Sequence, residues 1–100
     1  MQHLQAAAAL EPRDADIQYD LGIYFTQHNS WTNAVNCFSN SLAARPNFAP
    51  AQLAMGGALA NLGRAAEAAP HLREALRLDP RLLDAKTNLD RLLREHPEIH

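Results

Sequence analysis

Apolar side chains recur every three or four residues along most of the chain, which is the spacing of one face of an α-helix. Leu21 and Phe25 are four residues apart, and Ala34, Phe38 and Leu42 resume the same spacing after a short polar break. Threonine, valine and isoleucine, which favour strands, are scarce. The pattern therefore predicts six helices, at residues 2–11, 15–28, 31–44, 49–62, 65–78 and 82–95.

Two kinds of turn separate the predicted helices. Asn29 and Gly63 stand at equivalent places, and both residue types end a helix readily because they tolerate a positive φ. Prolines 46 and 80 end the other helices, since the residue before a proline avoids the α region. The candidate N-caps are Asp14 and Ser30.

The chain repeats itself at an offset of 34, the clearest organisational signal that it carries. Each unit reads as helix, turn and helix. A glycine inside a helix costs about 1 kcal/mol relative to alanine, so its recurrence at Gly22 and Gly56 predicts close backbone packing. Phe38 and Leu72 are predicted to fill the space between the helices. The identical pairs are Ala15/Ala49, Gln18/Gln52, Gly22/Gly56, Ala34/Ala68, Leu42/Leu76 and Pro46/Pro80.

The sequence resembles the tetratricopeptide repeat family, whose period is the same. The first unit supplies Leu21-Gly22, Phe25, Ala34, Phe38, Ser41 and Pro46, and the second supplies Met55-Gly56, Leu59, Ala68, Leu72, Ala75 and Pro80. The departures are Gln18 and Gln52 where the family often has tryptophan, and Asp90 where a third glycine would stand. The resemblance implies an all-α fold, a right-handed α-solenoid of antiparallel helix pairs with about six helices.

The repeat frame predicts a single domain over residues 1–100. It divides into a half repeat at 2–11, repeats at 15–48 and 49–82, a C-terminal capping helix at 83–95 and a tail at 96–100. The last helix has a polar outer face, as a terminal repeat needs. We interpret the chain as the C-terminal part of a longer array.

Composition and charge exclude several classes of function. The net charge of -2 gives no basic face for a nucleic acid. No apolar run is long enough to span a membrane. The single cysteine forbids an internal disulfide framework. The residues do not indicate a compartment, and we favour a cytoplasmic one.

Nothing in the sequence predicts catalysis, a metal or a cofactor. His28 is interpreted as a helix C-terminal residue that suits the dipole, and Cys37 as a buried or half-buried inert thiol. His96 and His100 are four residues apart, but Pro97 breaks the helix that would bring them together. We predict that the protein is not an enzyme.

The resemblance implies that one face of each first helix lines a concave surface that binds partners. Tyr19, Ile23 and Leu53 would give this surface an apolar middle, and Arg91 and Arg94 could hold an acidic side chain or a carboxylate. The family's known chaperone-binding clamp and asparagine ladder are not supported. The predicted surface comprises Asp16, Tyr19, Ile23, Thr26, Gln27, Pro50, Leu53, Gly57, Ala60, Asn61, Asp84, Thr87, Arg91 and Arg94.

The function predicted from these residues is a protein–protein interaction scaffold that holds an extended peptide or a helix of a partner. The alternative is a structural module whose uncapped N-terminal end pairs weakly with another copy. Two features stay open. Trp31 is either a packing residue or a ligand contact, and the asparagines at 33, 36 and 40 form either a solvated face or a partner surface.

Overall fold

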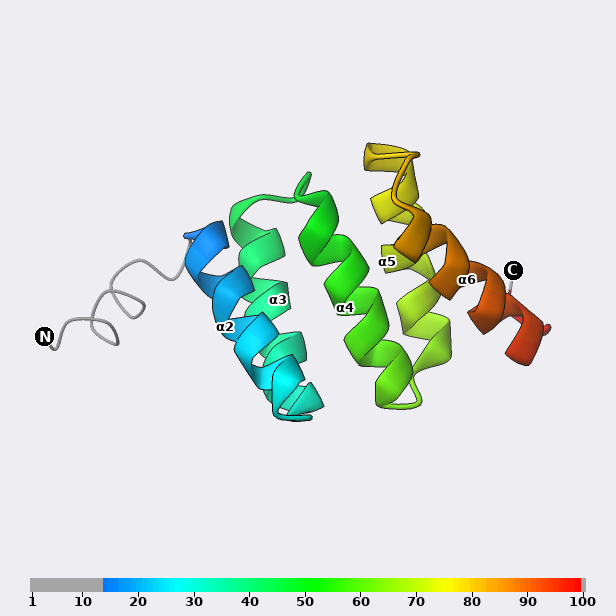
Figure 1. Cartoon of the computed structure of the whole chain (residues 1–100), viewed down its shortest axis with the longest axis horizontal. Helices are drawn as coiled ribbons and strands as arrows, with labels where there is room; N and C mark the ends of the chain where they lie inside the picture. The colour runs from blue at the N-terminus through cyan, green and yellow to red at the C-terminus, as the bar shows by residue number, and fades with distance from the viewer. Residues whose placement is uncertain (1–13, 100) are drawn as a thin grey trace, which may run out of the picture.

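The computed structural model describes residues 14–99 and places five helices in that range. They follow one another in a row between the two ends of the molecule (Figure 1). The predicted boundaries are confirmed to within one residue, while the helix predicted at 2–11 lies outside the described residues. The helices are α2 (Ala15–Gln27), α3 (Trp31–Ala44), α4 (Ala49–Asn61), α5 (Ala65–Leu78) and α6 (Leu83–Glu95).

Each helix packs against the next along the chain, and α4 also contacts α2 and α6. The described residues contain no strand. The α2–α3 pair and the α4–α5 pair are therefore two turns of an α-solenoid, and α6 stacks on the second pair. The all-helical solenoid predicted from the repeat is confirmed.

The recurrent glycines lie where the two helices of each pair touch. A Cβ atom on Gly22 would overlap the ring of Phe38, and one on Gly56 would lie 2.7 Å from Cγ of Leu72. Phe38 and Leu72 are fully buried in one continuous hydrophobic core. The prediction that Phe38 and Leu72 fill the space between the helices is confirmed, and the structure adds that each packs against the glycine of its own repeat.

The two turns inside the pairs have the same hydrogen-bonded geometry. Asn29 has φ 57° and Gly63 has φ 78°. In each turn the next residue donates back to the carbonyl five residues earlier, from Ser30 N to Phe25 O at 2.8 Å and from Arg64 N to Leu59 O at 2.9 Å. This is the left-handed helix ending that the sequence predicts.

The two candidate N-caps behave differently. Asp14 Oδ1 accepts from Asp16 N at 3.0 Å and from Ile17 N at 3.2 Å, as expected. Ser30 stands at the N-cap of α3 but makes no capping hydrogen bond with its side chain. Its hydroxyl instead accepts from Nδ2 of Asn33 at 3.0 Å, because this amide reaches back over the first turn. The predicted N-cap position of Ser30 is confirmed, but without the side-chain capping hydrogen bond that Asp14 makes in α2.

Helix α6 has a charged residue at the position where α2 and α4 have a buried glycine. Asp90 occupies the place of Gly22 and Gly56, and Lys86 Nζ lies 3.2 Å from Oδ2 of Asp90. Both residues are exposed, and so is Leu83 at the start of the helix. This face of α6 is thus mostly polar, whereas the same face of α2 and of α4 is buried.

Substituting alanine at the two adjacent glycines of α4 should have opposite effects on stability. Gly56→Ala pushes a methyl group into Leu72, so we expect the unfolding free energy to fall by about 1–3 kcal/mol. The methyl group added by Gly57→Ala meets no atom within 4 Å, and alanine has the higher helix propensity. The unfolding free energy of this variant should therefore rise by about 0.5–1 kcal/mol. Urea denaturation followed by circular dichroism measures both. A change of the unfolding free energy in the same direction for both variants would contradict the packing described.

Candidate functional site

A groove of about 410 Å³ runs past α2, α4 and the start of α6. Most of its lining comes from the first helix of each repeat. Most of the residues that line it are apolar. The lining residues are Tyr19, Ile23, Thr26, Trp31, Pro50, Leu53, Ala54, Gly57, Ala58, Asn61, Leu82, Asp84 and Asn88.

Tyr19 is held in the groove by aromatic neighbours. Its ring centroid lies 5.2 Å from that of Phe48 and 5.9 Å from that of Phe38, in tilted arrangements. Burial raises the pKa of the Tyr19 phenol, and the charge of Asp20 raises it further. The phenol therefore stays protonated at neutral pH and offers a hydrogen-bond donor beside an apolar surface.

One position of the repeat changes character along the row of first helices. It is Ile23 in α2, Gly57 in α4 and Arg91 in α6, each one repeat period after the last. No atom lies within 4 Å of the place where a Cβ on Gly57 would be, so the middle of the row is open. The surface thus passes from an apolar residue through a gap to an exposed cation.

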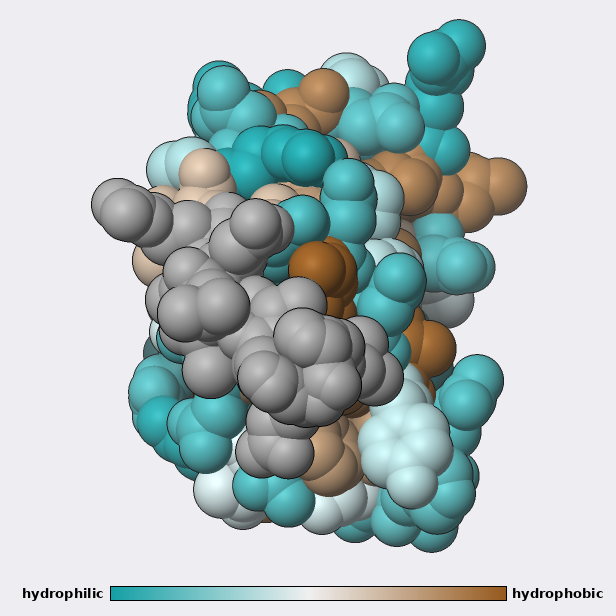
Figure 2. All heavy atoms as spheres, turned by 90° about the vertical axis from the view of Figure 1, so that its left-hand side faces the viewer, coloured by the Kyte–Doolittle hydropathy of each residue, from teal (hydrophilic) through white to brown (hydrophobic). Residues whose placement is uncertain are grey.

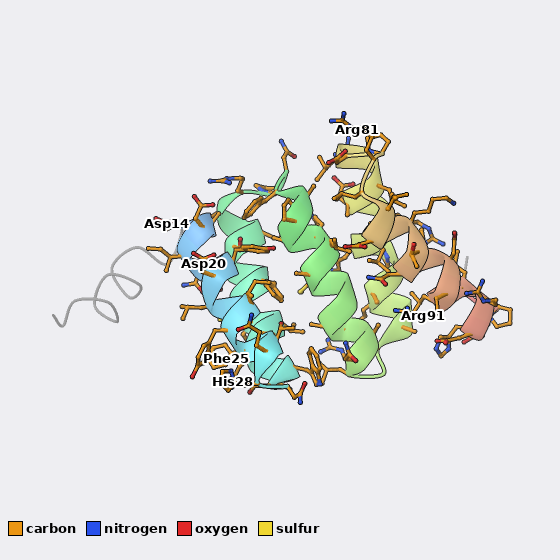
Figure 3. The ribbon with its side chains drawn as sticks, in the orientation of Figure 1. Asp14, Asp20, Phe25, His28, Arg81 and Arg91 are labelled. Carbon is orange, nitrogen blue, oxygen red and sulfur yellow. The ribbon has the colours of Figure 1, made fainter. Side chains whose placement is uncertain are left out.

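A second hollow of about 290 Å³, the side pocket, adjoins the groove between α4 and α6. Arg91 Nη2 donates to Oδ1 of Asn88 at 3.1 Å, and Asn61 Nδ2 donates to the carbonyl of Gly57 at 2.9 Å. Figure 3 shows Arg91 on α6, far along the row from Phe25 and His28 on α2. The side pocket is lined by Gly56, Gly57, Ala60, Asn61, Leu72, Asn88, Arg91, Leu92, Glu95 and His96.

The structure brings together most of the predicted surface, though not all of it. The groove contains Tyr19, Ile23, Thr26, Pro50, Leu53, Gly57, Asn61 and Asp84, and the side pocket adds Ala60 and Arg91. Four predicted residues line neither hollow and are exposed nearby: Asp16, Gln27, Thr87 and Arg94. Asp16 Oδ1 lies 3.5 Å from Nη1 of Arg45, so it is engaged in an ion pair on the surface.

Sequence reasoning missed part of the lining. Ala54 and Asn88 are one repeat period apart, so the same offset that connects Gly57 and Arg91 could have added them. Trp31 packs against the core, as the first of its two interpretations predicts, and it also lines the groove, while its contact with a ligand stays a prediction. The remaining lining residues that were missed are Gly56, Ala58, Leu72, Leu82, Leu92, Glu95 and His96.

The cysteine and the histidine that were considered as reactive groups both have surroundings that suit a structural role. Cys37 is buried, and burial raises the pKa of its thiol, which disfavours the reactive thiolate. His28 ends α2, and its Nδ1 lies 2.9 Å from the carbonyl oxygen of Tyr24. Residues 14–99 hold no cluster of three metal-ligating side chains. No helix among them is long and apolar enough to cross a membrane.

The glutamines that replace the family's tryptophan form half-buried hydrogen bonds. Gln52 Nε2 donates to the carbonyl of Pro46 at 3.3 Å, and Gln52 Oε1 lies 2.8 Å from Nδ1 of His71. Gln18 Oε1 accepts from Nδ2 of Asn40 at 3.4 Å. These contacts connect each first helix to its neighbours by polar bonds in place of an indole ring.

We expect His71 to make stability depend on pH. Burial lowers the pKa of His71 below its usual 6.5, and Glu67 opposes this only in part. The native chain therefore binds fewer protons than the unfolded chain, so stability should fall as the pH drops from about 7 through 6.5 toward the folded pKa. Chemical denaturation of wild type and His71→Gln at several pH values measures this. An equal slope in both proteins would contradict it.

Comparison with known proteins agrees with the geometry. A profile of the tetratricopeptide repeat family matches residues 24–82. The TPR domain of Arabidopsis OM64 superposes with a TM-score of 0.84 at 28% identity, over 90% of this chain and 74% of that one. MamA MSR-1 C2 gives a TM-score of 0.79 at 25% identity, over 92% and 53% of the two chains.

Relatives of known function also align with the chain. It is 35% identical over 88 residues to the peroxisomal targeting signal receptor of Eremothecium gossypii and 36% identical over 87 residues to that of Candida albicans. These alignments cover 88% and 83% of this chain but only 16% and 15% of the receptors. The chain thus spans about a sixth of the length of these relatives.

The helical solenoid and its groove define a protein-interaction module of the helical-repeat class. Within that class, the chain belongs to the tetratricopeptide repeat family.

Proposed function

We propose that the domain binds an extended peptide or a helix of a partner protein in the groove. The observation that carries the proposal is the open space at Gly57, in the groove that the apolar residues Ile23 and Leu53 also line. A ligand side chain could enter there without moving any atom of the protein. Solenoids use such surfaces for elongated ligands.

The side pocket supports a further preference in the same ligand. Arg91 can form two parallel hydrogen bonds to a carboxylate, and Asn61 and Asn88 add amide groups beside it. A peptide with an apolar segment followed by an acidic side chain or a free carboxylate would match both hollows. Asp16, Gln27, Thr87 and Arg94 remain predicted contacts at the margins.

The relatives support a peptide ligand in general terms. By name they are receptors for a targeting signal, although this chain corresponds to only a small part of each. We extend to this chain the recognition of a protein partner.

Selection from a random-peptide display library tests the proposal. Wild type should enrich peptides that share an apolar segment and a carboxylate. Gly57→Met fills the groove from a position where nothing clashes, so it should lose those peptides while keeping the helical content of wild type. Gly57→Ala, with its single added carbon, is the matched control and should retain most of the enrichment. Enrichment of the same peptides by Gly57→Met and wild type would overturn the proposal.

A further inference from the structure

Residues 96–99 form the same kind of turn as the two segments that connect one repeat to the next, 45–48 and 79–82. Each of the three has a proline at its second position and an apolar residue at its fourth. In each, the amide of the fourth residue donates to the carbonyl of the first, at 3.2, 3.1 and 3.0 Å in chain order. Pro97 follows Pro80 by only half a repeat period, so this turn comes directly after α6.

The fourth residue of the turn returns the chain to the body of the domain. In the turn at 79–82 this residue is Leu82, which lines the groove. In the turn at 96–99 it is Ile99, which is half-buried and packs against the hydrophobic core. At the other end of the turn, His96 N donates to the carbonyl of Leu92 at 2.9 Å. Both ends of the segment are therefore fixed against the domain.

This turn places His96 in the wall of the side pocket. The histidine is the C-cap of α6, is half-buried, and lines the pocket together with Arg91 and Glu95. Its Nδ1 lies 3.6 Å from Oε2 of Glu98. The other ring nitrogen, Nε2, is thus the one that can face a ligand.

The protonation of His96 decides the sign of the charge in the pocket wall. Helix α4 has no charged residue, and α5 contributes only Leu72 to the lining. The formal charges of Arg91 and Glu95 cancel, while Glu98 is exposed and is not part of the lining. A histidine changes its charge between about pH 5 and 8. The pocket wall is therefore neutral when the imidazole is neutral and positive when it is protonated.

We propose that His96 is a specificity-determining residue of the side pocket, where its protonated ring and Arg91 together hold the acidic group of the ligand. Ile99 is the positioning residue that keeps the ring in the pocket wall. This assignment rests on the proposed function, because it concerns the same ligand and the same pocket. It makes the preference for an anionic group increase as the pH falls.

The affinity of one peptide selected on wild type, measured at about pH 7.5 and about pH 5.5, tests the proposal. The peptide is made twice, once with its carboxylate and once with a neutral amide in its place. A carboxylate of ordinary acidity stays mostly ionised at both values. We expect the carboxylate form to bind about fivefold more tightly at the lower pH, the size of an exposed charge pair, and the amide form to bind equally at both.

The His96→Gln variant keeps a polar side chain but cannot gain a charge. It should bind as wild type does at the higher pH and lose the gain at the lower pH. His28→Gln is the matched control, because His28 is the C-cap of α2 and lies far along the row from Arg91 (Figure 3). It belongs to the α2 end of the molecule, whose surface mixes teal polar and brown apolar side chains (Figure 2). This control should keep the full gain.

The Ile99→Ala variant tests the positioning role. It should lose the gain at the lower pH while keeping the affinity of wild type at the higher pH, and Ile99→Leu should restore the gain. A merely structural role would instead lower the affinity at both pH values. Helical content is compared at each pH, since His71 makes stability depend on pH.

Two results would overturn the role of His96 and leave peptide binding intact. One is a gain of the same size in His96→Gln and in wild type, and the other is an equal gain for the amide form of the peptide. If wild type enriches no peptide, the proposed function fails, and the role of His96 fails with it.

Discussion

Replacing Phe38 by alanine should lower the unfolding free energy by about 3–5 kcal/mol. The ring has no exposed surface, fills the place that Gly22 leaves open, and lies beside Tyr19. Its removal leaves a cavity between α2 and α3 that neither backbone can close without losing contacts elsewhere. Since a domain of this size has a total stability of about 5–15 kcal/mol, this loss is a large share of the total. Chemical denaturation followed by circular dichroism measures the change.

The second repeat supplies a matched pair of controls for this result. Leu72→Ala truncates the equivalent residue, which is 1% exposed, and should cost about 2–5 kcal/mol. Leu83→Ala makes the same substitution at a residue that is 73% exposed and should change stability by less than about 0.5 kcal/mol. A loss of less than about 1 kcal/mol of unfolding free energy for Phe38→Ala would mean that the interface between α2 and α3 is not packed as described.

Replacing Leu53 by arginine should weaken the binding of a selected peptide by at least about 30-fold, which corresponds to roughly 2 kcal/mol. Leu53 is half-buried in the groove wall, so an arginine there brings a charge into the apolar middle and occupies the space next to Gly57. Isothermal titration with one peptide measures both proteins under the same conditions.

Leu83→Arg is the control for this second result, because it makes the same substitution at an exposed leucine that lines neither hollow. It should bind the peptide as wild type does. Both variants should keep the helical content and the thermal midpoint of wild type to within a few degrees. Equal affinities for Leu53→Arg and Leu83→Arg would remove the groove as the binding surface.

The fold followed from the sequence because each decisive feature is local or periodic. Asn29 and Gly63 end helices by their own backbone preference, and prolines 46 and 80 stop them for a steric reason. The repeat offset then aligns Gly22 with Gly56 and Phe38 with Leu72 without any knowledge of distances. These inferences need only the positions of residues along helices, which can be read from the sequence.

The site was less predictable because it depends on how successive repeats are inclined to one another. The period identifies the face of each first helix but not how far that face extends before it turns to solvent. Gln27 at the end of α2 and Thr87 on α6 were therefore included, although they line neither hollow. The polar contact between Gln52 and His71 joins residues 19 positions apart, and no period of the sequence indicates it.

Chemical-shift mapping of the isotope-labelled chain with a selected peptide locates the bound ligand most directly. Binding in the groove predicts the largest changes at Tyr19, Ile23, Leu53 and Asn61, with small changes on the outer faces of α3 and α5. The result that would contradict it is a set of large changes confined to those outer faces, with the signals of the groove residues unmoved.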